Sequence, residues 1–415
     1  MTCSARSLVD MEERAPHSDW QSLTSVYRSA ILCSLGFFFV SFIIPIVAYD
    51  PAGLGATGFE VALVFALLTL GAALFSPVAG RVTREGRRRE SIFVGSVVRA
   101  VAYLGMAGSF YARSIDFLIL DSLIWGLGVA FYNVGSDAEI SERMMRENRS
   151  EAFGKRSAVT AQGQIIGTVI GFIIFFVKDI YLALEFYAFM NVVGGLLVYL
   201  DKRPLIKQTE VIGISPINVP GRNVVALVFA AAVDAFVLAL LAPFVELFIL
   251  EAFTTQIEMV ALLYLPGGVI TAFVGGAIGR AADRSNKILV VTGSALVVSS
   301  TTFFLALLPS LIGGNSLGMF LVAPLFALQS VAGLGVFTVM TSVLGTAYEG
   351  KAGEGFGRFE AAMGTARFSG PLVGGIFWDM IGPIAPFFFV GFVEFLLIPA
   401  YYLGMRQYQN SLHVK

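Results

Sequence analysis

Long apolar stretches separated by short polar segments make up most of the chain. Each stretch is continuously apolar instead of alternating between apolar and polar positions, which favours helices over strands. A helix of about 20 such residues crosses a bilayer. We therefore predict twelve membrane-spanning helices, over residues 29–49, 58–79, 91–111, 115–135, 158–177, 180–200, 223–245, 257–279, 287–309, 318–341, 357–378 and 383–405.

The polar segment 201–222 divides these helices into two groups of six. It contains three prolines and follows the sixth apolar stretch, which is typical of a linker. We therefore predict five parts of the chain. They are an N-terminal tail (1–28), a first six-helix bundle (29–200), the linker (201–222), a second six-helix bundle (223–405) and a C-terminal tail (406–415).

The two groups also match locally, at four sites that occur in the same order. The pairs are Gly80-Arg81 with Gly279-Arg280, Pro45 with Pro243, Phe153-Gly154-Lys155 with Phe356-Gly357-Arg358, and Gly167 and Gly171 with Gly370 and Gly374. Parallel repeats of six helices are typical of secondary transporters, in which one half rocks against the other.

Basic residues set the predicted orientation. With the N-terminus inside, the inner segments hold 24 of the 28 lysines and arginines. This bias places both termini in the cytoplasm. Residues 1–27 are polar and of mixed charge, without the features of a cleavable signal peptide, so we expect the first apolar stretch to remain as a span. The predicted location is the plasma (inner) membrane.

Composition agrees with a membrane protein and narrows the function. Hydrophobic residues make up 56% of the chain and charged residues only 14%, against about a quarter in soluble domains. The net charge of −1 gives no basic character for nucleic acid. His17 and His413 lie in the tails, and Cys3 and Cys33 have no metal-binding spacing. We expect no metal site, no cofactor and no enzyme activity, because no nucleophile–base pair is evident either.

Three loops carry a family resemblance. Residues 279–287, GRAADRSNK, resemble the Gly-x-x-x-Asp-Arg-x-Gly-Arg loop of the major facilitator superfamily, with Asn286 and Lys287 in place of its last Gly and Arg. Residues 78–90 are similar to the first-half copy of that loop, with Thr83 near the usual Asp position, and residues 139–156 resemble the loop before the fifth span. The resemblance implies an all-α polytopic membrane protein of twelve helices in two six-helix pseudo-repeats.

Charged side chains in these loops are candidates for a cytoplasmic gate. Arginines and acids at helix ends can pair across the two halves when the inner side is closed, and opening must break those pairs. The alternative is that the basic residues only anchor the topology. The candidates are Gly279, Asp283, Arg284, Lys287, Arg87, Arg88, Glu139 and Arg149.

Asp234 is the strongest candidate for coupling. It lies 12 residues beyond Arg222, so about 18 Å into a core of about 30 Å. A charge at that depth is costly and is usually functional. In the superfamily the seventh span lines the central cavity, and DAFVLALLAP resembles a pattern of proton-coupled drug antiporters. Asp234 could carry a proton, since burial favours a neutral carboxyl, or pair with a cationic substrate; the alternative is a structural role.

Other intramembrane polar residues extend this candidate site. Asp121, Trp125 and Tyr132 are spaced to share one face of the fourth span, which suits an amphipathic or cationic solute, or else a Trp/Tyr pair at the membrane interface. Arg367 is a candidate partner for Asp234 or for an anionic substrate. Gln329 could bind substrate or join helices.

Two glycine patterns predict close helix packing. Gly167 and Gly171 lie four residues apart in the fifth span. Gly370, Pro371 and Gly374 in the eleventh span resemble the core of the antiporter motif.

Secondary active transport of a small solute, coupled to protons, is the predicted function. No Gly-rich phosphate loop is present, so ATP is not the expected energy source. Export of lipophilic or cationic compounds is the leading prediction, and uptake of a sugar, organic acid or other metabolite is the alternative. A non-cycling sensor or assembly partner is the alternative from another class. The expected partners are the substrate, protons and the lipid bilayer, and the chain is expected to be a monomer.

Overall fold

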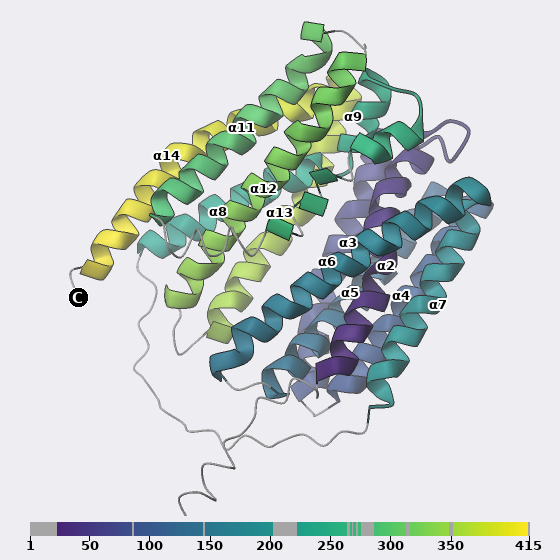
Figure 1. The fold of residues 1–415 in the computed structure, drawn as a ribbon, viewed down its shortest axis with the longest axis horizontal. Helices are drawn as coiled ribbons and strands as arrows, with labels where there is room; N and C mark the ends of the chain where they lie inside the picture. The colour runs from purple at the N-terminus through teal and green to yellow at the C-terminus, as the bar shows by residue number, and fades with distance from the viewer. Residues whose placement is uncertain are drawn as a thin grey trace, which may run out of the picture.

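The computed structural model of the chain describes residues 23–84, 87–143, 146–201, 222–263, 266–267, 269–270, 273–274, 286–312, 316–347 and 352–413. The described part is helical and contains no strand. The first group of helices comprises α2 (Thr24–Tyr49), α3 (Gly58–Arg84), α4 (Arg88–Tyr111), α5 (Ile115–Arg143), α6 (Arg146–Val177) and α7 (Ile180–Tyr199). The second comprises α8 (Arg222–Leu241), α9 (Val245–Ala252), α11 (Lys287–Ile312), α12 (Ser316–Ala347), α13 (Ala352–Met380) and α14 (Ala385–His413) (Figure 1).

Apart from 257–279, every predicted span overlaps one of these helices, and many of the helices extend beyond the predicted bounds. Within the described residues, eight helices are long and apolar enough to cross a membrane, or nine if α8 and α9 count as one broken span. The predicted span 257–279 falls largely outside the described residues. The predicted all-helical membrane fold is confirmed.

The seventh span is broken, which the sequence prediction of one helix over 223–245 missed. α8 ends at Leu241, α9 begins at Val245, and their axes differ by 43°. Pro243 lies in the turn between them and has no backbone N–H to continue the helix. Its repeat counterpart Pro45 lies inside the continuous helix α2, so the proline alone did not predict the break.

The two groups of helices pack in the same pairwise pattern. In the first half, α2 packs against α6 and α7, and α4 packs against α5 and α7. In the second half, α8 packs against α13 and α14, and α11 packs against α12 and α14. Each half thus repeats the other, and the helices α2 to α7 and α8 to α14 stand as two groups in Figure 1.

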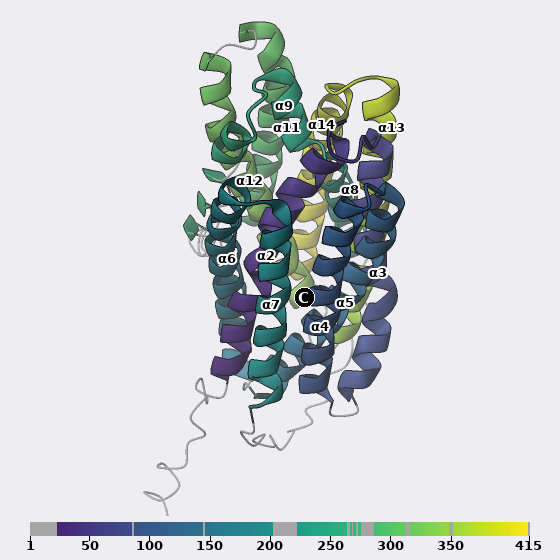
Figure 2. The same ribbon diagram turned by 90° about the vertical axis from the view of Figure 1, so that its right-hand side faces the viewer.

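The halves meet mainly along α3 and α13. Gly375 of α13 allows this approach, because a Cβ there would lie only 2.7 Å from the Cα of Phe59. We call the end at which α2 begins and α14 ends the tail end, and the opposite end, with the short loops after α2, α4, α6 and α13, the short-loop end (Figure 2).

Contacts between the halves close the short-loop end. The Nε1 of Trp378 donates to the Tyr49 hydroxyl at 3.3 Å, and the two rings meet edge to face with 6.1 Å between centroids. The Asp379 carboxylate accepts hydrogen bonds from the backbone N–H groups of Gly58 and Phe59, both at 2.9 Å. These are first-turn donors of α3 that have no partner within their own helix, so the second half caps a helix of the first.

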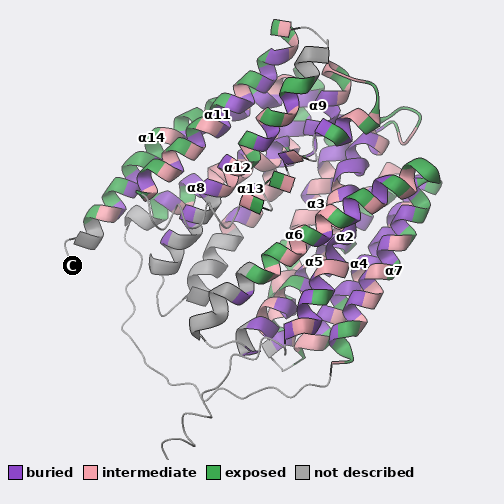
Figure 3. Ribbon diagram, viewed as in Figure 1, coloured by how far each residue is buried: buried purple, intermediate pink, exposed green. Residues whose placement is uncertain are grey.

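The outward faces of the helices are apolar. Exposed positions run along the outer sides of helices such as α11 and α14 (Figure 3). Many of them are large hydrophobic residues, for example Leu289, Leu296, Phe304, Phe392 and Phe395, each at least half exposed. An apolar surface of this extent suits contact with lipid and not with water.

Candidate transport site

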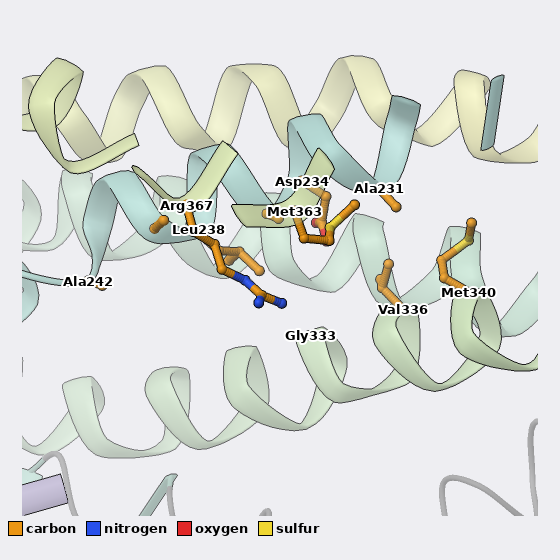
Figure 4. Close-up of a pocket in the computed structure, with 11 residues that line it drawn as sticks. Ala231, Asp234, Leu238, Ala242, Gly333, Val336, Met340, Met363 and Arg367 are labelled. Carbon is orange, nitrogen blue, oxygen red and sulfur yellow. The ribbon is translucent and has the colours of Figure 1, made fainter. Parts of the chain in front are cut away.

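A pocket of about 300 Å³ opens between α8, α12 and α13 of the second half (Figure 4). Most of its lining is apolar, and the two charged residues among the lining side chains are Asp234 and Arg367. The full lining is Ala231, Asp234, Ala235, Leu238, Ala239, Ala242, Gly333, Val336, Met340, Met363 and Arg367. A mainly apolar pocket with a few polar groups is typical of a small-molecule site.

Small residues create the hollow. Three alanines of α8 that line it, Ala231, Ala235 and Ala239, are spaced by four residues, so they share one face of the helix, and Ala242 follows directly after the helix. Gly333 of α12 borders the same pocket. Alanine and glycine reach only a short distance from the helix, which leaves room between α8 and α12 for a ligand.

Close packing of α13 on α8 brings Arg367 to this pocket. A Cβ at Gly370 would lie 2.4 Å from the Phe236 carbonyl oxygen, and one at Gly374 would lie 2.5 Å from the Leu240 carbonyl oxygen. Glycine is therefore needed at both positions for the helices to approach this closely. Arg367 lies one turn before Gly370, and its guanidinium extends from α13 into the space beside α8 and α12 (Figure 4).

Glu394 of α14 is a buried acid that the sequence analysis missed. Its side chain is fully buried, and it interacts with Asp234 across the contact between α14 and α8. Neither of its carboxyl oxygens has a hydrogen-bond partner. The signal that singled out Asp234, a lone acid in a long apolar stretch, was also present at Glu394.

Comparison with known proteins identifies the family. The model of the Major Facilitator Superfamily matches residues 27–323, more than half of the chain. The chain belongs to the major facilitator superfamily. An uncharacterised transporter of this superfamily type from Methanocaldococcus jannaschii is 21% identical over 358 residues, which cover 83% of this chain and 88% of that protein.

A solved structure shows the same superfamily fold. The crystal structure of the human organic anion transporter MFSD10 (TETRAN) matches with a TM-score of 0.65 and 18% sequence identity, covering 93% of this chain and 100% of that chain. At this identity the likeness shows the fold alone. Membership of the superfamily makes the protein a membrane transporter, as the sequence predicted, and not an enzyme.

The predicted stripe of α5 lies inside the first half of the superfamily fold. Trp125 is only 1% exposed and packs against Phe37 and Tyr103, with ring centroids 5.5 and 5.8 Å away. Tyr132 is buried, with its hydroxyl 3.3 Å from that of Ser29. The two rings therefore share a helix face, but this face is turned toward α2 and α4, and neither ring lines the pocket.

Asp121 and Arg99 are buried in the same half without meeting. Asp121 lies against Gly105 of α4, and its Oδ2 has no hydrogen-bond partner. Arg99 donates to the Cys33 carbonyl oxygen and lies 5.3 Å from the centroid of the Tyr132 ring. The structure thus places Asp121 at an interface between helices, away from Asp234 and Arg367.

Gln329 and the glycines of α6 hold helices together. The Nε2 of Gln329 donates to the Thr302 hydroxyl at 2.8 Å, which joins α12 to α11. A Cβ at Gly167 would lie 2.0 Å from the Leu35 carbonyl oxygen, and one at Gly171 would lie 1.9 Å from the Tyr187 hydroxyl. These glycines therefore permit close contact of α6 with α2 and α7. Pro371 is accommodated inside α13, between Gly370 and Gly374.

The gate candidates that the structure describes lie in the first half, except Lys287, which lies in the second half. Glu139 of α5 pairs with Arg143 at 2.6 Å and with Arg89 at 3.2 Å, and Arg89 also donates to the Asp201 carbonyl oxygen. Arg87 and Arg88 stand at the start of α4, and Lys287 at the start of α11. Gly279, Asp283 and Arg284, and the side chain of Arg149, lie outside the described residues.

Proposed function

We propose that this protein is a proton-coupled secondary active transporter that moves an amphipathic organic anion through the pocket of its second half. The observation that carries the proposal is one apolar pocket that holds a single cation, Arg367, together with a carboxyl, Asp234. Superfamily members work by alternating access, and the two repeated halves of this chain supply the parts for it.

Arg367 favours an anionic substrate. A guanidinium presents several N–H donors in a planar fork that fits a carboxylate or a sulfonate. The remaining lining, with Leu238, Val336, Met340 and Met363, suits an apolar body attached to that anionic group. The human structural neighbour is an organic anion transporter, which supports the same substrate class.

Asp234 favours coupling to protons. It borders the pocket and also meets a second buried acid, Glu394. Two carboxyl groups side by side in a membrane cannot both carry charge without a large penalty, so at least one proton is expected between them. The antiporter-like patterns around Asp234 and Gly370 favour export, so the proposed direction of transport is out of the cell.

A second candidate is export of cationic compounds, in which Asp234 itself binds the cargo. The same pocket supports it, because Asp234 is one of the two charged residues in its lining. The two candidates differ in the charge of the ligand and in which residue binds it.

A thermal-shift screen of the purified protein separates these candidates. We expect amphipathic carboxylates and sulfonates to raise the melting temperature, since a ligand stabilises the state to which it binds. The same compounds should lose their effect in Arg367→Gln and keep it in Arg406→Gln, which removes an exposed cation at the tail end. Arg367 is thus tested against a control of equal charge change.

Other outcomes of the screen count against the proposal. Stabilisation by organic cations, lost in Asp234→Asn and retained in Arg367→Gln, would establish the second candidate instead. Stabilisation by no class of compound would favour a transporter-like protein that no longer cycles.

A further inference from the structure

Glu394 is a buried acid with no assigned role in the pocket. It is fully buried on α14, and neither of its oxygens finds a hydrogen-bond partner. None of the ion pairs among the described residues involves it. It also does not line the pocket, which distinguishes it from Asp234. An unpaired acid within a membrane span is costly and marks a functional group.

The register of α14 on α8 explains why Glu394 meets Asp234. The two helices run in opposite directions (Figure 1), and a Cβ at Gly404 would lie 2.8 Å from the Leu227 side chain. Asp234 lies seven residues after Leu227 along α8, and Leu397 lies seven residues before Gly404 along α14. Because the helices are antiparallel, Asp234 and Leu397 lie at the same level. Glu394 is one turn beyond Leu397, about 4.5 Å along the axis at about 1.5 Å per residue, which a glutamate side chain easily spans.

Among the residues that the structure describes, few other ionisable groups surround the pair. Tyr401 lies on the same face of α14, two turns from Glu394, and its buried hydroxyl interacts with both acids and has no hydrogen-bond partner. Helix α11 packs on the other side of α14, and its one charged residue is Lys287, at its first position. Arg367 reaches the pair only from the pocket, on the side of Asp234.

Access to the two acids is sequential. Asp234 is partly exposed and lines the pocket, whereas Glu394 is shielded from the pocket and from the outer surface. A proton that enters from the pocket therefore meets Asp234 first. The only carboxyl that interacts with Asp234 among the described residues is that of Glu394.

We propose that Asp234 and Glu394 form a proton relay, in which Asp234 takes a proton from the pocket and passes it to Glu394 when side-chain rotation brings the two carboxyl groups into hydrogen-bond contact. The O–H bond at Asp234 breaks as an O–H bond forms on the Glu394 carboxylate, and Asp234 is left as a carboxylate. The total charge of the pair does not change in this step. A second proton from the pocket can then neutralise Asp234. The relay deepens the proposed function and rests on its coupling to protons.

Infrared spectroscopy of the purified protein tests the relay without any substrate. We expect a carbonyl stretching band from a protonated carboxyl that is shielded from water, and we expect Glu394→Gln to remove it. Glu394→Asp keeps a carboxyl and should retain the band at a shifted frequency. Glu185→Gln removes an exposed acid of α7 and should leave the band unchanged.

Hydrogen exchange after transfer to D2O tests the order of the two acids. We expect the Glu394 band to shift more slowly in Asp234→Asn than in the wild type, because the route through Asp234 is blocked. A Glu394→Gln spectrum with the full wild-type band would overturn the proposal, and so would unchanged exchange in Asp234→Asn. If the infrared tests fail while anions still raise the melting temperature, the relay is refuted and the proposed substrate class is not. If no anion raises the melting temperature, the proposed substrate class fails and the infrared result on the relay still holds.

Discussion

The role of an individual residue in this protein depends on what its face of the helix contacts. Asp234 and the alanines of α8 share the face that lines the pocket, so a charge there meets a ligand. Trp125 and Tyr132 share a face of α5 that is buried against α2 and α4, so the same kind of spacing serves packing there. The role of a side chain therefore depends on whether its face of the helix lines the pocket or packs against other helices.

Trp125 provides a test of this distinction. We expect Trp125→Ala to lower the free energy of unfolding by about 3–5 kcal/mol, because it leaves a cavity among Phe37 and Tyr103. Ligands found for the wild type should still stabilise the variant, since Trp125 does not line the pocket. Thermal unfolding with and without ligand measures both effects. Tyr111→Ala, at a position 84% exposed, is the control and should change neither.

The result against this account would be selective loss of ligand binding in a stable Trp125→Ala protein. That outcome would return Trp125 to the substrate site, as the spacing of α5 alone first indicated.

The sequence predicted the transport site only in part. Asp234 and Arg367 were predictable because a charge in a long apolar stretch stands out, and both line the pocket. Glu394 carried the same signal and was overlooked. Their meeting was not predictable, since it depends on the register of α14 against α8, which is set by side chains such as Leu227 at Gly404. The spacing of residues predicts which side chains share a face of one helix, but it does not predict which neighbouring helix that face contacts.

At the scale of the helices, membrane spans were predictable and their interruption was not. Apolar length alone predicts α2 to α7 and most of the second half, because lipid tolerates few other structures. Pro45 and Pro243 occupy equivalent positions, yet only the second accompanies a break.

Asp379 of α13 caps the first turn of α3, and these two helices must separate there when the short-loop end opens. Its carboxylate holds two backbone N–H groups of the opposite half. We expect Asp379→Ala to weaken the closed state by about 1.5–3 kcal/mol, as for hydrogen bonds to a charged group. That is roughly a ten- to hundredfold shift toward opening.

Labelling of Ala235→Cys in the pocket by an impermeant thiol reagent, added from the short-loop end, reports the opening. The reagent should react faster when Asp379→Ala is also present. Asp50→Ala is the matched control, since the Asp50 carboxylate accepts from the Ala52 N–H within its own loop and not from the opposite half. Equal labelling rates in the two variants would show that the cap does not hold this end closed.

At the scale of the whole molecule, the two halves share a packing pattern but differ in their chemistry. The pairs formed by α2 with α7 and by α8 with α14 are equivalent. In the second half this pair contains Asp234 and Glu394, whereas the first span has Gly36 at the position equivalent to Asp234. The first half buries Asp121 and Arg99 at contacts between helices, and Arg99 donates to a backbone carbonyl. We infer that the second half couples protons to substrate while the first provides the surface against which it rocks.

Proton movement in proteoliposomes is the most direct test of that central claim. A pH-sensitive dye is enclosed in the vesicles, and a gradient is imposed of an anion that stabilises the purified protein. We predict that wild-type protein moves protons in response to the anion gradient. Asp234→Asn should move none while it still exchanges labelled anion for unlabelled anion across the membrane. Equal proton movement by wild type and Asp234→Asn, at equal amounts of folded protein, would contradict the account.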